Sequence, residues 1–295
     1  MTSYANITCA LAIITVTASN CWSDQSSPAT APPPSLAPLD PTRAWVLIIV
    51  GHPGDSAYAE QFADIASRLG AIAHERLGVA EERICVWSGV DASDGTDAFT
   101  VGTSRGPATR ETLGRDIAAL REKLDKQTEF CVIVLGHGHQ QGRRAALNLP
   151  GPDVDADEFA SWFRDIPNRR SIFFITTSVS GAFVKPLAAP RRIVIAAATS
   201  DEQNATLFPL ALIDQLESQQ ASPEGDDAKP RSISVLDLYL AVERDVTNRY
   251  TTETLIVTEH PQLDDNGDGR GTEIQLDPEK PARPLIRSEL SLIHI

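Results

Sequence analysis

Basic residues and cysteines are scarce in this chain. Its 295 residues include 26 Lys and Arg against 40 Asp and Glu, which gives a formal net charge of −14. Binding to nucleic acid or to an anionic membrane needs clustered Lys and Arg, so the composition argues against both kinds of partner. No internal repeat is visible. The hydrophobic residues, 42% of the chain, can fill one substantial core or two small ones.

Long hydrophobic runs are also missing. The apolar run near the start, residues 6–16, is too short to span a bilayer comfortably, so we expect no integral membrane protein. It is typical of an export signal with small residues at the cleavage site, although the first five residues carry no Lys or Arg. We expect a signal peptide over residues 1–22 and an exported protein, secreted to the periplasm or the cell envelope. Cys21 could carry a lipid anchor, but Asn20 before it is a poor match for such sites.

A proline-rich segment follows the signal. Residues 23–43 read as an extended linker, because they are rich in Pro and Ser and offer few apolar side chains for a core. We expect one folded domain over residues 44–276 and a C-terminal tail over residues 277–295. Of the four cysteines, only Cys85 and Cys131 lie in that domain. Both are inside apolar segments, so we expect them to pack as small hydrophobic side chains rather than form a disulfide framework.

Apolar runs and amphipathic segments alternate along the domain. The runs predict strands, and apolar residues at steps of three and four predict helices between them. Polar, Gly-rich residues 91–107 predict a loop. Continuous apolar strands are typical of a mainly parallel sheet, here of about six strands, with helices on both faces. We expect strands at residues 45–50, 83–87, 130–135, 171–176, 192–198 and 254–258, and helices at residues 58–72, 109–124, 155–162, 205–216 and 235–249.

Two of these strands end in residues that can do chemistry. The third strand ends in Gly136-His137-Gly138, and the fourth is followed by Thr177-Ser178. Ligands of open α/β sheets bind beyond the carboxyl ends of the strands, so His137 and Ser178 face one crevice if their strands are neighbours. Histidine moves protons near neutral pH, and a hydroxyl can attack a carbonyl. Structural roles are the alternative: His137 could bond to backbone at a strand end, and serine commonly follows buried strands.

A strand ending in His-Gly, followed by a strand ending in Asp-Ala-Cys-x-Ser-Gly, is the pattern of the caspase-like fold. Residues 135–138 and 176–181 resemble these two motifs, and residues 148–153 and 263–269 resemble further segments of a bacterial branch. Over residues 44–272 the chain therefore resembles a bacterial legumain-like member of the legumain and caspase superfamily of cysteine peptidases. The resemblance implies a three-layer caspase-like α/β fold.

The resemblance also implies roles for three residues. In these peptidases a cysteine attacks the peptide carbonyl, a histidine protonates the leaving amine, and backbone N–H groups hold the oxyanion. These roles fall on Ser178 as nucleophile, His137 as acid and base, and Gly138 as oxyanion donor. The Asp that precedes Ala-Cys in many members is Thr176 here.

Ser178, in place of the cysteine of the related peptidases, matters for activity. A thiol with a pKa of about 8.5 is partly ionised at neutral pH, whereas a serine hydroxyl needs a close base oriented by a third group. The resemblance thus implies a peptidase homologue with little or no proteolysis, a pseudoenzyme that keeps peptide or protein binding and needs no cofactor. An active serine-type hydrolase using Ser178 and His137 is the alternative, and a carboxylate on the far nitrogen of His137 would favour it.

A third interpretation concerns an acidic loop. Asp264-x-Asn266-x-Asp268-Gly269 matches the first half of a calcium-binding loop, in which oxygen ligands alternate before a glycine turn. A calcium-dependent interaction protein of the cell envelope would use Asp264, Asn266 and Asp268 as Ca²⁺ ligands. The twelfth position is Gln275 rather than Glu, and a solvated turn explains the same residues.

Overall fold

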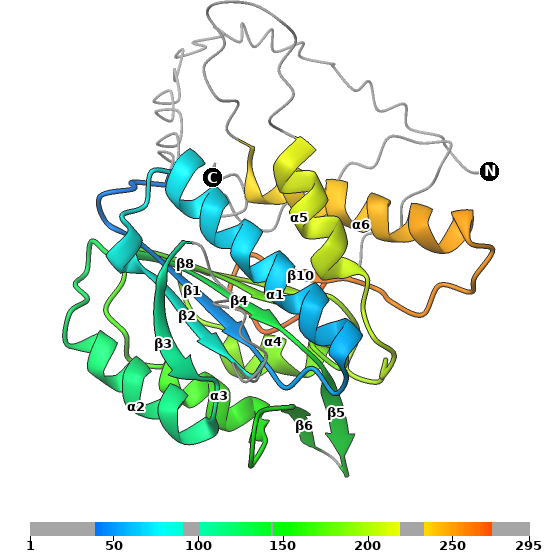
Figure 1. Cartoon of the computed structure of the whole chain (residues 1–295), viewed down its shortest axis with the longest axis horizontal. Helices are drawn as coiled ribbons and strands as arrows, with labels where there is room; N and C mark the ends of the chain where they lie inside the picture. Colours follow the sequence, from blue (N-terminus) through cyan, green and yellow to red (C-terminus); the bar gives the residue numbers. More distant parts are fainter. Residues whose placement is uncertain (1–38, 91–100, 143, 219–232, 273–295) are drawn as a thin grey trace, which may run out of the picture. The chain divides into compact units, whose positions relative to one another are not determined.

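Seven strands form the central sheet in a computed structural model that describes residues 39–90, 101–142, 144–218 and 233–272 (Figure 1). The strands lie in the order β10-β9-β8-β4-β1-β2-β3, and all neighbours are parallel except β10 and β9. Their bounds are β1 Ala44–Val50, β2 Ile84–Ser88, β3 Thr103–Pro107, β4 Glu129–Leu135, β8 Arg170–Ile175, β9 Arg192–Ala196 and β10 Gln262–Asp264. The predicted α/β class with a mainly parallel sheet is confirmed, with seven strands rather than about six.

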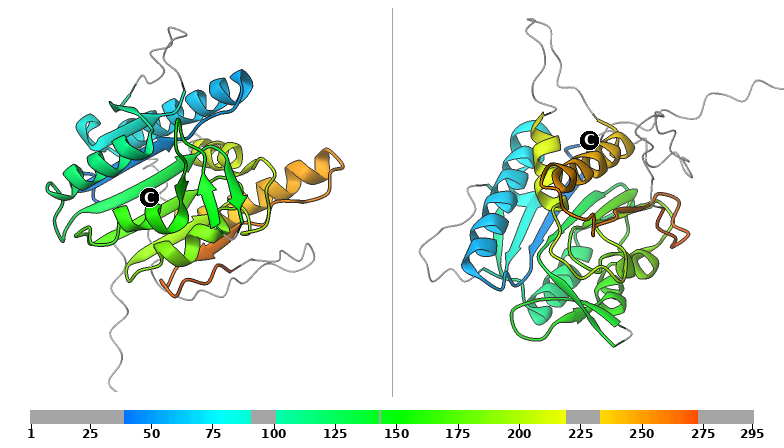
Figure 2. Two further views of the ribbon diagram at one scale, coloured as in Figure 1. Left: turned by 90° about the horizontal axis from the view of Figure 1, so that it is seen from below. Right: turned by 90° about the vertical axis from the view of Figure 1, so that its right-hand side faces the viewer.

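Helices cover both faces of the sheet, which makes three layers (Figures 1 and 2). One face packs on α1 (Ser56–Ala71), α5 (Phe208–Ser218) and α6 (Val235–Thr252), and the other on α2 (Arg110–Arg121), α3 (Ala156–Trp162) and α4 (Gly181–Leu187). Side chains alternate along each strand, so Ile48 of β1 packs on the first layer while Leu47 packs on the second. Burial on both faces explains why the strands are almost wholly apolar.

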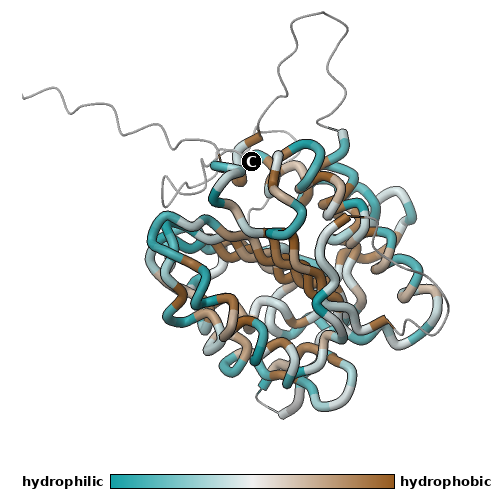
Figure 3. The backbone as a smooth tube through the Cα atoms, turned by 60° about the vertical axis from the view of Figure 1, so that its left-hand side comes forward, coloured by the Kyte–Doolittle hydropathy of each residue, from teal (hydrophilic) through white to brown (hydrophobic). Residues whose placement is uncertain are grey.

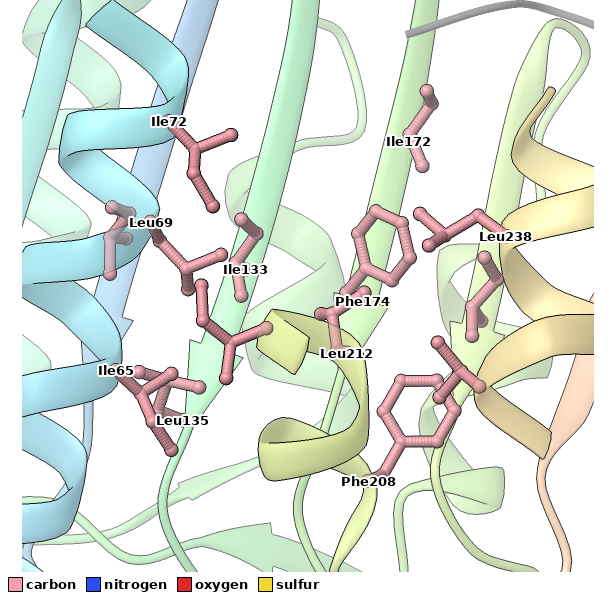
Figure 4. Packing of buried hydrophobic residues seen from close by; sticks show 14 of the residues in the cluster. Ile65, Leu69, Ile72, Ile133, Leu135, Ile172, Phe174, Phe208, Leu212 and Leu238 are labelled. Carbon is pink, nitrogen blue, oxygen red and sulfur yellow. The ribbon is translucent and has the colours of Figure 1, made fainter. Parts of the chain in front are cut away.

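The strands form the most hydrophobic part of the molecule, between the two helical layers (Figure 3). Figure 4 shows one of the two cores, to which Ile65 and Leu69 of α1, Phe174 of β8 and Leu238 of α6 belong. These side chains are at most 3% exposed. Burying an aliphatic or aromatic side chain of this size contributes about 1.5–3 kcal/mol, so both faces of the sheet are fixed in place by packing.

Side-chain caps set where the helices begin. Asp55 accepts a hydrogen bond from the N–H of Tyr58 at the start of α1, and Thr109 accepts one from the N–H of Thr112 at the start of α2. Asp155 caps α3 in the same way. Such caps satisfy N–H groups that have no partner within the helix. They place the starts of α1 and α2 just beyond the carboxyl ends of β1 and β3, at the edge of the sheet where ligands are expected.

Two predicted elements were wrong. Residues 103–107 were expected in a loop but form β3, which lies parallel to β2 at the sheet edge. Residues 254–258 were expected as a strand and form none, since Leu255 is 54% and Ile256 85% exposed and no described strand pairs with them. The antiparallel edge strand is β10 instead, which pairs through Leu263 opposite Ile195.

A small antiparallel sheet follows directly after His137. It consists of β5 (Gly138–Gln141), β6 (Arg144–Leu147) and β7 (Val154–Asp155), in that order. The hairpin of β5 and β6 extends from the lower right of the molecule in Figure 1. The sequence analysis did not predict this sheet, yet it fixes Gly138 at the edge of the candidate crevice.

The predicted termini lie outside the described residues. The signal peptide over residues 1–22, the lipid-anchor candidate Cys21 and the tail over residues 277–295 therefore stay predictions, and the linker is described only from residue 39 onward. The predicted domain over residues 44–276 is described as far as residue 272. Among the helices that the structure describes, none combines the length and apolar character needed to cross a bilayer.

Candidate functional site

His137 and Ser178 follow the carboxyl ends of two adjacent parallel strands. β4 pairs with β8, and Val134 lies opposite Ile175 in the last register pair. His137 comes two residues after the end of β4, and Ser178 comes three residues after the end of β8. The two side chains are therefore brought to one edge of the sheet, as the strand pattern predicted. This is where open α/β sheets bind their ligands.

Gly138 links the two strand ends. Its N–H donates a hydrogen bond to the Oγ of Ser178 over 3.4 Å, and the serine is only 2% exposed. A Cβ at Gly138 would come within 2.5 Å of the carbonyl oxygen of Ser178, so the close approach requires glycine. The N–H to which the family resemblance assigns oxyanion binding is thus directed at the candidate nucleophile.

The residue after the candidate nucleophile has an unusual backbone. Val179 has φ 50, a left-handed conformation that is strained for a buried β-branched residue. Its N–H donates to the carbonyl of Glu202 over 2.8 Å. One residue later, the hydroxyl of Ser180 accepts from the N–H of Ala198 at 2.9 Å. Two contacts to the segment after β9 therefore hold this turn, and strain kept in such a turn is typical of functional sites.

A backbone carbonyl orients His137. The Nε2 of the imidazole lies 3.1 Å from the carbonyl oxygen of Pro53, while the rings of Tyr58 and Phe62 pack against it at centroid distances of 4.5 Å and 5.4 Å. Because a carbonyl only accepts, Nε2 must carry the proton, so in the neutral ring Nδ1 has a free lone pair. Burial lowers the pKa of His137 below its usual 6.5, which favours this neutral form.

The partners of His137 differ from those of a serine-protease histidine. Its far nitrogen bonds to the carbonyl of Pro53 and not to a carboxylate. Among the described residues, no hydrogen bond joins the imidazole to Ser178, whose hydroxyl is held by Gly138 instead. The nearby Asp55 raises the pKa of His137 through its charge but uses its carboxylate to cap α1. The observation that would favour an active serine hydrolase is therefore not met in the part of the chain that the structure describes.

Thr176, at which the family resemblance would place an acidic residue, makes structural contacts. It is fully buried, and its hydroxyl donates to the carbonyl of Val134 over 2.7 Å. Its own carbonyl accepts from the hydroxyl of Thr206. The side chain thus ties the ends of β4 and β8 together and presents no charge to the crevice.

A contact between a carboxylate and an imidazole lies beside the candidate nucleophile, in the segments after β9 and before β10. The carboxylate of Glu202 pairs with the ring of His260 and accepts the N–H of Thr199 over 2.7 Å. Burial opposes ionisation of Glu202, yet these hydrogen bonds lower its pKa on balance. Because the carbonyl of Glu202 also holds Val179, an ionised acid is built into the wall of the turn. The sequence analysis did not single out Glu202 or His260.

The three predicted calcium ligands lie in one turn. Asp264 is 1% exposed, and its carboxylate accepts the N–H groups of Gly267 and Gly269 at 2.8 Å and 2.9 Å. The side-chain oxygen of Asn266 accepts the N–H of Asp268 at 3.0 Å. Burial raises the pKa of Asp264 despite these bonds. The oxygens that would bind Ca²⁺ thus shape the turn, and within the described ranges no group of three or more His, Cys, Asp or Glu side chains is placed to hold a metal. Calcium binding stays a prediction.

Pro53 is a further site residue that was not predicted from the sequence. It acts through its backbone carbonyl, and no residue type signals that role. Its position does carry a signal, because it follows β1, and β1 is the other neighbour of β4. A loop at that point must border the residues that follow β4.

Comparison with known proteins assigns neither a family nor a function. No protein-family model matches the chain, and no curated protein is significantly similar to it. The case for a function therefore depends on the geometry of His137, Gly138 and Ser178.

Proposed function

We propose that this protein is a legumain/caspase-like peptidase homologue in which Ser178 occupies the nucleophile position. The observation that supports the proposal best is the placement of His137 and Ser178 at adjacent strand ends, joined by the N–H of Gly138. The three-layer α/β fold with its mainly parallel sheet is compatible with the caspase-like fold.

The chemistry of this arrangement is suited to a thiol. A thiol is acidic enough to pass its proton to the histidine before it attacks, and the imidazolium that results protonates the leaving amine, so a histidine held by a backbone carbonyl is sufficient. A serine hydroxyl must lose its proton to the histidine during the attack, and an acid that stabilises the resulting imidazolium accelerates this step. His137 has only the carbonyl of Pro53 at its far nitrogen. Peptide hydrolysis by Ser178 is therefore expected to be very slow.

Binding can persist where hydrolysis is lost. The strand ends, the strained turn at Val179 and the ring-packed His137 do not depend on the atom that attacks. The ligand in this proposal is a peptide or a protein segment that lies over the carboxyl ends of β4 and β8. An exported protein would meet such ligands in the periplasm or cell envelope.

Hydrolysis of a mixed peptide library, followed by mass spectrometry, tests the proposal. Wild type is compared with Ser178→Ala, which removes the hydroxyl, and with Ser178→Cys, which restores a thiol. We expect the wild type and Ser178→Ala to cleave equally little, and Ser178→Cys to cleave more than either. Cleavage by the wild type that Ser178→Ala abolishes would instead establish the serine-type hydrolase.

If the protein is instead a calcium-dependent interaction protein, we expect a different result. Added Ca²⁺ would raise the thermal midpoint of the wild type relative to a chelated sample, because a ligand that binds only the folded state stabilises it. Asp268→Asn, which removes one carboxylate charge from the loop, would abolish that rise. An unchanged midpoint would exclude this function for the loop.

A further inference from the structure

A separate cavity lies between the β2–β3 edge of the sheet and α2. It has a volume of about 350 Å³, and its polar lining comes from Ser104, Arg105, Arg115, Asp116 and Lys123, with Trp87 in the wall. β1 lies between β2, which lines the cavity, and β4, whose end carries His137. The cavity is therefore not part of the candidate crevice. Its volume is in the range of small-molecule sites.

A β-bulge directs Arg105 into this cavity. In the parallel pairing of β2 and β3, Val86 lies opposite Ser104 but Trp87 lies opposite Gly106, so Arg105 is an extra residue in β3. Successive residues of a regular strand point to opposite faces. Ser104 and Arg105 nevertheless both line the cavity. The bulge allows this because it interrupts the alternation, so that two successive side chains point to the same face. Bulges are rare between parallel strands. This one brings the cationic side chain of Arg105 to the cavity.

The positive charges in the cavity exceed the negative ones. Three cationic side chains line it, and Asp116 is the one carboxylate among the lining residues. Both oxygens of Asp116 are engaged, because one accepts from Trp87 Nε1 at 3.0 Å and the other from Arg115 Nε at 2.9 Å. Among the described residues, no ion pair joins Arg105 or Lys123 to an acidic side chain. Such a cluster is notable in a chain with a net charge of −14.

Arg105 also keeps a donor without a partner. Its Nη2 donates to the carbonyl of Glu82 over 3.3 Å, and the guanidinium also contacts the thiol of Cys85. Its Nε is buried and has no hydrogen-bond partner among the described residues. A buried donor that is left unpaired costs about 1–3 kcal/mol. An oxyanion in the cavity would accept from this donor, and a guanidinium can offer two parallel N–H groups to such an anion.

We propose that this cavity binds a phosphate-type anion, either free phosphate or the phosphate group of a small monoester. The guanidinium of Arg105 donates to the phosphate oxygens, Lys123 and Arg115 supply charge from the rim, and the hydroxyl of Ser104 adds a donor. Three cations against one carboxylate leave two positive charges, which matches the dianion present above a second pKa of about 6. Bound phosphate ties the edge strand β3 to α2.

Calorimetric titration of the full-length protein tests the proposal, with inorganic phosphate, glycerol 3-phosphate and malonate as probes at constant ionic strength. We expect saturable binding of one phosphate-type anion per chain. Arg105→Met should weaken it about 10-fold or more, and Lys123→Met by a smaller factor, as expected for charge-assisted hydrogen bonds. Lys126→Met is the matched control, because it removes the same charge from an exposed residue that does not line the cavity.

The probes and variants separate the possible outcomes. Binding of both phosphate probes identifies free phosphate as sufficient, and binding of glycerol 3-phosphate alone identifies a monoester as the ligand. Circular dichroism checks the fold of each variant, and if Arg105→Met does not fold, the comparison of Lys123→Met with Lys126→Met decides. The proposal is overturned if no phosphate probe binds saturably, if malonate binds equally well, or if Lys126→Met weakens binding as much as the cavity variants.

Discussion

The imidazole Nε2 of His137 lies 3.1 Å from the backbone carbonyl oxygen of Pro53. This contact joins the loop after β1 to the end of β4, and it fixes both the orientation and the tautomer of the ring. Because the partner is a neutral carbonyl, it holds the ring without stabilising the imidazolium as a carboxylate would. The contact therefore suits a histidine that acts beside a readily ionised nucleophile such as a thiol, rather than beside a serine hydroxyl.

The first prediction concerns the protonation of His137. We expect the neutral Nε2–H tautomer and a pKa below 6.5, because burial disfavours the imidazolium. A histidine whose pKa is lowered by folding contributes stability that is present above the unfolded value of about 6.5. That stability is lost as the pH falls from 6.5 through the folded pKa, since the unfolded chain takes up the proton first. Nitrogen-15 NMR of the ring across this range measures both properties, and a Nδ1–H tautomer or a pKa above 6.5 would contradict the assignment.

The second prediction concerns the strained turn. Val179→Gly should be at least as stable as Val179→Ala, because glycine adopts φ 50 freely while alanine there costs about 1–2 kcal/mol. Val134 of β4 provides the matched control, since it is buried and lies in a regular strand. There the glycine variant should be less stable than the alanine variant by about 0.5–1 kcal/mol. Chemical denaturation gives the free energy of unfolding of the four variants. If the alanine variant were the more stable one at both positions, Val179 would be unstrained.

The third prediction concerns a buried carboxylate in α6. Burial raises the pKa of Glu243 to about 7, and one of its oxygens has no hydrogen-bond partner among the described residues. Since the folded state holds this proton more tightly than the unfolded chain, wild-type stability should fall as the pH rises from about 4.5 to about 7. Glu243→Gln should therefore raise the free energy of unfolding by about 1–2 kcal/mol at pH 8, a figure reduced for partial solvent screening, and by less at pH 5. Equal effects at the two pH values would show that Glu243 stays ionised when folded.

Sequence patterns predicted the placement of His137 and Ser178 because buried parallel strands have a strong apolar signature and their carboxyl ends meet at one edge. The edge strands were harder to predict. Thr103–Pro107 forms β3 although it contains no large apolar residue, since backbone pairing with β2 and not burial holds it there. Residues 254–258 have strand-like side chains but form no strand after α6, and the first three of them are exposed, so composition alone placed the last strand wrongly.

The contacts that orient the site were beyond the reach of a single sequence. The carbonyl groups of Pro53 and Glu202 hold His137 and Val179, and every residue type has such a carbonyl. The phosphate-site proposal has the same origin, because the bulge at Arg105 results from the register of two paired strands. Residue types could indicate which side chains reach the edge of the sheet, whereas the backbone geometry determines what holds them there.

Labelling of Ser178→Cys by a peptidyl electrophile tests the central claim most directly. The substitution should disturb the fold little, because cysteine is close to serine in volume and tolerates burial. We expect covalent modification at residue 178 in Ser178→Cys, much slower modification when His137→Ala is added, and none at that position in the wild type. Mass spectrometry locates the adduct and gives its rate. The buried Cys85 and the partly buried Cys131, present in all three proteins, serve as internal controls. A folded Ser178→Cys protein that stays unlabelled would contradict the account, as would labelling of Ser178 in the wild type.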